Sequence, residues 1–204
     1  MAILNGYITL DEARSYVGRQ SSVDPAELED VVTSASRLID RHCGRHFYSK
    51  TEARTFEVDD LCELHFGPFN DLTTLTTLKT DAAGDGTYET TISASSYQLE
   101  PFNAAVRAEP YLEVWLLGTT QFPAPVYGAR EDLIQITGVW GWPSVPAEVK
   151  QACRIITAEI SKLQLAPLGS MGGEFGVQYV RNQLPARAVS LLAPYRHPDN
   201  FGVA

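Results

Sequence analysis

The clearest pattern in the chain is a change of period from helical to alternating and back to helical. Apolar residues recur at spacings of three and four near both ends, whereas apolar and polar residues alternate over residues 51–142. Helical spacing places apolar side chains on one face of a helix, and alternation places them on one face of a strand. The pattern predicts an α+β protein, a small helical bundle core with an inserted antiparallel β region and a C-terminal helical arm.

Capping residues mark where the first two helices begin and end. Thr9 and Glu12 have the spacing of a capping box for a short helix that closes at Gly18. Asp24 then precedes Pro25, which suits the first position of a longer helix because it lacks a backbone donor. We expect Gly44 to end this helix in a left-handed conformation.

A third helix starts at Pro146, after a strand and a tight aromatic turn. Its apolar face and that of the second helix are the two longest helical stripes in the chain. We expect these two faces to pack on each other as the core. The stripes are Leu28, Val31, Val32, Ala35, Leu38, Ile39 and His42 in the second helix, and Val149, Ala152, Cys153, Ile156, Ile160 and Leu163 in the third.

The middle of the chain predicts an antiparallel sheet. Gly67-Pro68, residues 81–86 and residues 101–103 are turn signals, and residues 118–130 are too rich in proline for a central strand. We expect strands at residues 54–58, 61–66, 72–78, 88–92, 111–117 and 134–139.

Together these elements predict one domain over residues 1–204. The helical core takes residues 7–48 and 143–165, and the β region takes residues 51–142. A glycine-rich segment, 166–183, is expected to be a flexible loop because its glycines leave no regular apolar face. The arm, 184–204, contains a short helix opened by Pro185.

Composition narrows the class of protein. The chain is 44% hydrophobic and 20% charged, which is typical of a globular protein that folds without a metal or a disulfide. No apolar stretch approaches the roughly 20 residues of a membrane span, so we expect no membrane partner and a protein that stays in the cytosol of the cell that makes it. The cysteines Cys43, Cys62 and Cys153 lack a paired CxxC spacing and are expected to be reduced.

The net charge of −9, with 25 acidic and 16 basic residues, argues against a protein that grips nucleic acid. An acidic surface can serve solubility alone. It can also line a passage through which DNA slides without sticking.

Candidate chemistry is sparse. The chain has no GxSxG, no phosphate-binding loop and no dinucleotide fingerprint, so we expect no enzyme, no catalytic residues and no cofactor. Cys43 and His46, followed by Cys62 and His65, form the one zinc-like spacing. However, Cys62 and His65 lie three apart on an expected strand and would point to opposite faces, so we assign no metal residues.

The aromatic residues leave a third class open. Trp140 and Trp142, with Trp115, could form a stacking platform for a sugar, although a tryptophan between glycines at a corner more often fills a packing gap. The alternatives to a structural protein are therefore a small zinc-stabilised binding module and a sugar-binding or enzymatic protein built on the β region.

Four segments together resemble the head-to-tail adaptor (head-tail connector) proteins of tailed bacteriophages. They are YITLDEARSYVG, VVTSASRLIDRHCGRHFYS, ITGVWGWPSVPAEVKQACRIITAEI and LPARAVSLLAPYR, which cover about half of the chain. The long β insert and the glycine-rich segment depart from the pattern.

The resemblance implies a structural virion protein in the neck, assembled in the host cytoplasm as a homo-oligomeric ring, a dodecamer, between the portal and a downstream connector, stopper or tail protein. DNA would be passing cargo only. In that family the ends of the chain help to join the ring to the portal. The portal-binding candidates are Arg187, Leu191, Tyr195 and Arg196.

Overall fold

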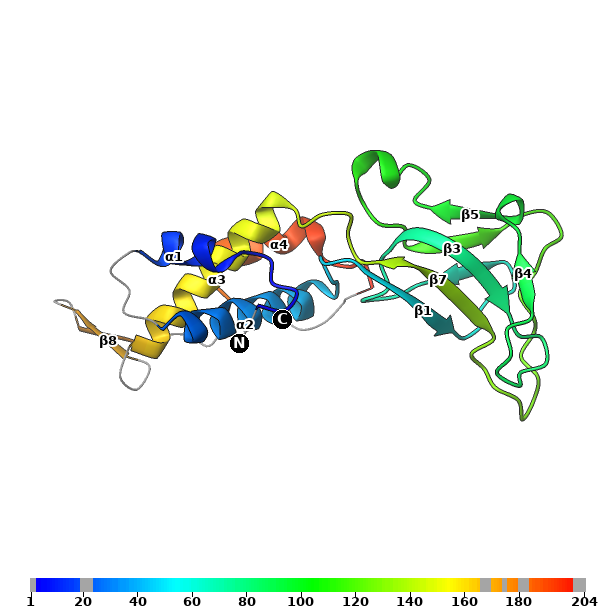
Figure 1. The fold of residues 1–204 in the computed structure, drawn as a ribbon, viewed down its shortest axis with the longest axis horizontal. Coiled ribbons are helices and arrows are strands. Elements are labelled where there is room, and N and C mark those ends of the chain that lie inside the picture. Colours follow the sequence, from blue (N-terminus) through cyan, green and yellow to red (C-terminus); the bar gives the residue numbers. More distant parts are fainter. Residues whose placement is uncertain (1–2, 19–23, 166–169, 174–175, 180–183, 200–204) are drawn as a thin grey trace. The chain divides into compact units, whose positions relative to one another are not determined.

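The computed structural model describes residues 3–18, 24–165, 170–173, 176–179 and 184–199. The chain divides into two compact units, one made of Met1–Gly44 with Val145–Ala204 and the other of Arg45–Ser144. The described residues of the first unit form helices and a short hairpin, and the second unit is a β structure (Figure 1), which confirms the predicted α+β class. The second unit starts and ends close to the predicted β insert, 51–142; the single domain over 1–204 stays a prediction.

The first helix, α1 (Leu10–Val17), begins with the predicted capping box. Thr9 accepts a hydrogen bond from the Glu12 N–H at 3.2 Å, and the Glu12 carboxylate accepts one from the Thr9 N–H at 2.8 Å. The other Glu12 oxygen pairs with Arg154 of α3 (Ala147–Leu165) at 2.6 Å. The same carboxylate therefore caps α1 and ties it to α3.

The second helix, α2 (Pro25–Cys43), has the predicted boundaries. Asp24 accepts a hydrogen bond from the Ala26 N–H at 2.9 Å, and Gly44 ends the helix in the left-handed conformation at φ 66°. The residues predicted to cap the two ends of this helix, Asp24 and Gly44, are therefore its caps in the structure.

The expected packing of α2 on α3 is confirmed at its centre. Val31 and Ala35 of α2, and Ala152 and Ile156 of α3, are all buried, and Ser36 Oγ lies 3.7 Å from Cys153 Sγ. The ends of the predicted stripes differ, because Leu38 is 36% exposed and Ile160 is only half-buried. Polar Ser36, Thr157 and Ser161 are buried instead; Ser36 and Ser161 donate to carbonyls one turn earlier in their own helices.

The β unit contains two antiparallel sheets. One has the strand order β1-β7-β3-β4 and the other β2-β6-β5. Strand β7 is central and alternates buried and half-buried residues along its whole length, as a strand covered mainly on one face does. The strands are β1 (Lys50–Phe56), β2 (Glu63–His65), β3 (Leu72–Thr80), β4 (Thr90–Ile92), β5 (Tyr97–Glu100), β6 (Glu113–Leu116) and β7 (Ile134–Trp140).

The two sheets share one apolar core. Leu64 and Val114 come from the three-stranded sheet, and Leu78 and Ile136 from the four-stranded sheet. Phe122, from the proline-rich loop, joins the same cluster. The predicted strands at 61–66, 88–92 and 111–117 are correct in place but shorter in the structure, and β5 lies in a stretch for which no element was predicted.

The glycine-rich segment, 166–183, is described only in part, and its expected flexibility stays a prediction. It contains a two-stranded antiparallel hairpin of β8 (Ser170–Gly173) and β9 (Gly176–Tyr179). The remaining residues of that prediction lie outside the described residues. Backbone pairing of this kind needs no apolar face, and that is why the side-chain pattern did not reveal it.

The arm contains a last helix, α4 (Ala186–Leu192), followed by a 3-10 turn at Ala193–Tyr195. Pro185 occupies the cap position, immediately before the helix that it was expected to open. Among the helices of the described residues, none combines the length and apolarity that crossing a membrane requires.

Candidate functional site

The C-terminal arm, which carries the predicted portal-binding residues, packs on its own unit. Ala188 and Leu192 of α4 are fully buried, and α4 lies against α3. The His197 N–H donates to the Cys43 carbonyl at 2.8 Å, which satisfies an acceptor that the end of α2 would otherwise leave open. The inner face of the arm therefore completes the helical unit.

The outer side of the same arm holds all four predicted residues. Arg187, Leu191 and Tyr195 follow one another at intervals of four, so they share one side of the arm, and Arg196 follows directly. Arg187 and Arg196 are exposed, whereas Leu191 and Tyr195 are half-buried. Arg187 forms no ion pair with any described residue. The structure brings the four residues together, and their binding to a portal stays a prediction.

Two residues of the arm, Tyr195 and Arg196, lower the pKa values of nearby groups. The Tyr195 hydroxyl donates to Glu148 Oε2 at 2.8 Å and lowers the pKa of that carboxyl. Partial burial, and then the positive charge of Arg196, lower the pKa of His42. The sequence could not reveal the Tyr195–Glu148 bond, because the two residues are far apart in the chain.

The three tryptophans do not form the stacking platform considered from the sequence. Trp140 and Trp142 are 1% and 7% exposed, whereas Trp115 on β6 is 47% exposed. Trp142 packs on Phe47 with ring centroids 5.3 Å apart. Trp140 therefore belongs to the apolar core of the β unit, Trp142 is buried against Phe47, and Trp115 is the tryptophan that presents a large area to solvent.

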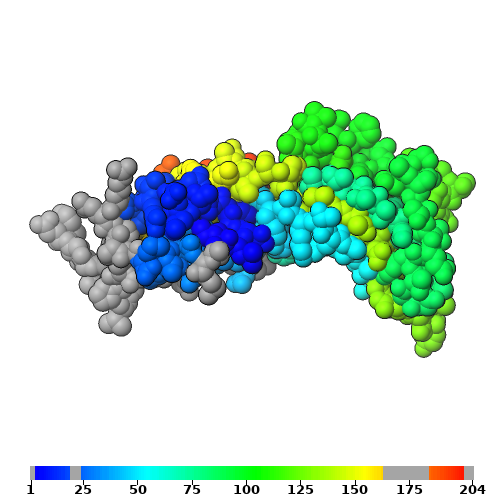
Figure 2. Space-filling model, in the orientation of Figure 1, coloured from blue at the N-terminus to red at the C-terminus, as the bar shows by residue number. Residues whose placement is uncertain are grey.

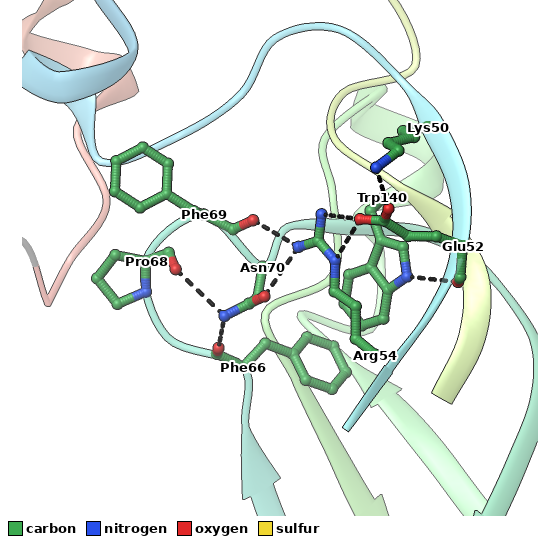
Figure 3. A network of polar contacts seen from close by, with 8 residues as sticks. All are labelled: Lys50, Glu52, Arg54, Phe66, Pro68, Phe69, Asn70 and Trp140. Carbon is green, nitrogen blue, oxygen red and sulfur yellow. Dashed lines mark hydrogen bonds and ion pairs between the residues drawn. The ribbon is translucent and has the colours of Figure 1, made fainter. Parts of the chain in front are cut away.

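Trp140 is part of a polar network on the four-stranded sheet (Figure 3). Its indole N–H donates to the Glu52 carbonyl at 3.0 Å, and the Arg54 guanidinium lies 4.6 Å from the ring centroid. Arg54 also donates to Glu52 Oε1, to the Phe69 carbonyl and to Asn70 Oδ1 at 2.7–2.9 Å. The guanidinium thereby holds the loop at residues 66–70 to β1. The charge of Arg54 has a structural role here.

The residues of the zinc-like spacing lie in different surroundings. Cys43 is buried at the end of α2, and the His46 ring stacks near Tyr48 and Phe69. His65 instead contacts two carboxylates, Glu63 at 3.4 Å and Glu113 at 3.1 Å. In the part of the chain that the structure describes, no three histidine, cysteine or acidic residues are grouped as a metal would need.

The helical unit also has an open pocket of about 570 Å³ beside the N-terminus of α1. Glu12, Glu29, Lys150 and Tyr7 are ionisable residues in its lining. Glu12 is already engaged by the α1 cap and Arg154. Cysteine and histidine do not occur among the described residues that line the pocket.

Neither a protein-family model nor a curated protein matches the sequence. Solved structures do share the fold. A chain in the neck of an empty GTA particle computed with C6 symmetry superposes with a TM-score of 0.61 at 19% identity, covering 96% of this chain and 92% of that one. A chain in the virion of a native gene transfer agent (GTA) particle gives a TM-score of 0.58 at 20% identity, with the same coverage.

A third match is a chain in the neck of a native GTA particle computed with C12 symmetry, with a TM-score of 0.56 at 18% identity and, again, 96% and 92% coverage. The likeness spans both units of this chain. The fold is therefore that of chains found in these particles.

Proposed function

We propose that the protein is a structural virion protein of the neck of a phage-like particle, a head-to-tail adaptor that forms a ring between the portal and the tail-proximal connector proteins. The observation that carries this proposal is the shared fold, because it covers 96% of the chain and therefore residues of both the helical unit and the β unit. The four sequence segments that resemble adaptor proteins point the same way.

A ring of identical subunits suits both the comparisons and the charge. The neck structures that share the fold were computed with C6 and C12 symmetry, so we propose a dodecamer. The net charge of −9 disfavours adhesion of the DNA that would pass through the ring. The role needs no catalytic group and no cofactor.

The outer side of the arm is the proposed portal contact. Arg187 and Arg196 supply guanidinium groups that pair well with carboxylates, and Leu191 and Tyr195 supply half-buried apolar surface beside them. A downstream connector, stopper or tail protein would then bind elsewhere on the ring.

The test is to mix the protein with a candidate portal and to look for a co-migrating ring by light scattering and electron microscopy. Arg187→Glu should weaken portal binding about tenfold or more and leave the melting temperature unchanged, because Arg187 is exposed and forms no ion pair with described residues. Lys162→Glu, also exposed on the helical unit, is the matched control. Equal binding by both variants would remove the arm from the portal contact, and the lack of any ring would overturn the adaptor role.

A further inference from the structure

The outer face of the three-stranded sheet β2-β6-β5 is an apolar and acidic surface. Glu63 pairs with Trp115 and His65 pairs with Glu113 across β2 and β6, so all four point to this face. Leu61 and Leu117 lie just outside β2 and β6, two residues beyond Glu63 and Trp115. Leu61, Leu117 and Trp115 are 37%, 43% and 47% exposed, an unusual amount of large apolar surface in one place.

Hydrogen bonds hold Trp115 in position on this face. Its indole N–H donates to Glu113 Oε2 at 3.0 Å, and the other oxygen of Glu113 lies 3.1 Å from His65 Nδ1. His65 Nε2 in turn lies 3.4 Å from Glu63 Oε1. An exposed aromatic side chain that is already fixed loses little entropy on binding, as the anchor residue of an interface should.

The charge of the face decides what kind of contact can cover it. Glu63 and Glu113 of this face, and Glu100, which pairs with Glu113 from β5, are acidic, and His65 is the one basic residue among them. Two copies meeting through this same face would bring these carboxylates together, which disfavours a two-fold contact. The occupant must be a different surface, and a contact between two different surfaces of one chain builds a ring when its rotation closes.

The β unit itself presents a surface of complementary character. Residues 118–130, in the order GTTQFPAPVYGAR, contain no acidic residue in a chain that has 25. Val126 is 55% exposed and Tyr127 fully exposed. The yellow-green atoms of this part of the chain reach the surface of the unit in Figure 2.

Hydrogen bonds fix this loop on both sides of its exposed part, at Phe122 and at Arg130. At the start, Phe122 is buried and its N–H donates to the Leu61 carbonyl at 2.8 Å. At the end, the Arg130 guanidinium binds both oxygens of Asp132 at 2.8 and 2.5 Å, and the Arg130 N–H donates to the Gly84 carbonyl at 3.2 Å. Pro123 and Pro125 stiffen the stretch between the anchors.

We propose that the Trp115 face of one subunit binds the proline-rich loop, 118–130, of a second copy of this chain. Proline-rich extended segments dock on exposed aromatic side chains because they are ordered before binding. The loop also places no carboxylate against the glutamates of the face. This contact joins neighbours within the proposed ring, so the inference rests on the proposed function.

The loop of the same chain is the competing occupant, since Phe122 is bonded to Leu61 beside the face. Disulfide trapping between different chains separates the two cases. Cys62→Ser provides the background, because Cys62 is the exposed cysteine whereas Cys43 and Cys153 are buried. One preparation then carries Gln98→Cys, which faces Trp115 across β5 and β6, and the other carries Ala124→Cys in the loop.

The two preparations, with different mass tags, are mixed, assembled with or without the portal, and oxidised. A ring that yields tagged heterodimers supports the proposal, and Thr91→Cys, exposed on β4 of the other sheet, should give none in place of Gln98→Cys. A ring without heterodimers overturns this inference and leaves the adaptor role standing. A disulfide that forms only within one chain carrying both substitutions also overturns the inference alone. Absence of any ring overturns the adaptor role and the inference together.

A second measurement needs no new cysteine. Trp115→Ala should lower the association constant of the subunits about tenfold or more, the usual effect of truncating an interface anchor. The melting temperature of the β unit should change no more than it does for an ordinary surface substitution, because Trp115 is half exposed. A ring of unchanged association constant would contradict the proposal.

Discussion

At the scale of single residues, the β unit contains a buried charge whose protonation is coupled to folding. Asp71 is 1% exposed, accepts from Arg45 Nη1 at 2.8 Å and from the Trp142 indole at 3.2 Å. Burial raises the pKa of Asp71 to about 6, and the nearby Arg45 charge opposes this only in part. The folded protein therefore keeps a proton on Asp71 at pH values where the unfolded chain has lost it.

The sign of the resulting pH dependence is fixed. Between the ordinary pKa of 3.8 and about 6 the folded state binds more protons, so the free energy of unfolding contributed by Asp71 falls as the pH rises through this window. Asp71→Asn should remove that decline, as measured by urea denaturation at several pH values. Asp59→Asn, at an exposed position, is the control and should keep it. An identical pH slope in wild type and Asp71→Asn would contradict the coupling.

At the scale of elements, the helical unit depends on the contact between α2 and α3. Ile156 is 2% exposed at the centre of that contact, whereas Ile160, one turn later, is half-buried. Ile156→Ala should cost about 2–5 kcal/mol of unfolding free energy, because it leaves a cavity, and Ile160→Ala should cost clearly less. Denaturant titration of the two variants measures the difference. Equal losses would show that the packing is not centred on Ile156.

The turn after β7 offers a similar comparison in the β unit. Gly141 has φ 100°, and an added Cβ would overlap the Tyr48 carbonyl oxygen. Gly118 has φ 67° with open space around it. Gly118→Ala should therefore cost only the strain of the left-handed backbone, about 1–2 kcal/mol, and Gly141→Ala should cost more because the backbone at Tyr48 must also move. A lower melting temperature for Gly141→Ala than for Gly118→Ala would bear this out, and the opposite order would contradict it.

The elements also show which features the sequence could reveal. Thr9, Asp24 and Gly44 act within one turn of their own position, so the ends of α1 and α2 were predictable. The strand β5 (YQLE) alternates over only four residues, too few for the pattern to predict a strand, and it exists because β6 pairs with it. The exposure of Trp115 was missed because alternation tells which residues share a face but not which face meets the core. At the arm, helical spacing placed Arg187 and Leu191 on one side, but no local signal linked Tyr195 to Glu148.

At the scale of the whole molecule, the β unit is built as an insertion. Lys50 pairs with Trp140 and the first and last strands are neighbours, so the chain enters and leaves the unit at one place. Domains with adjacent ends and a core of their own can often be separated from their host. The two proposed contacts lie on different units. The portal contact is on the helical unit, and the contact between subunits is on the β unit.

We therefore expect a fragment of residues 45–144 to fold alone. Its two sheets share one apolar core that includes Trp140, and the networks around Arg45 and Arg54 lie entirely within it. Cooperative thermal unfolding and the blue-shifted fluorescence of buried Trp140 and Trp142 would report the native fold, and a non-cooperative transition would contradict it. The folded fragment should fail to bind the portal, because the arm is absent, but should compete with the intact chain for ring assembly through the Trp115 face. The Trp115→Ala fragment is the matched control and should not compete.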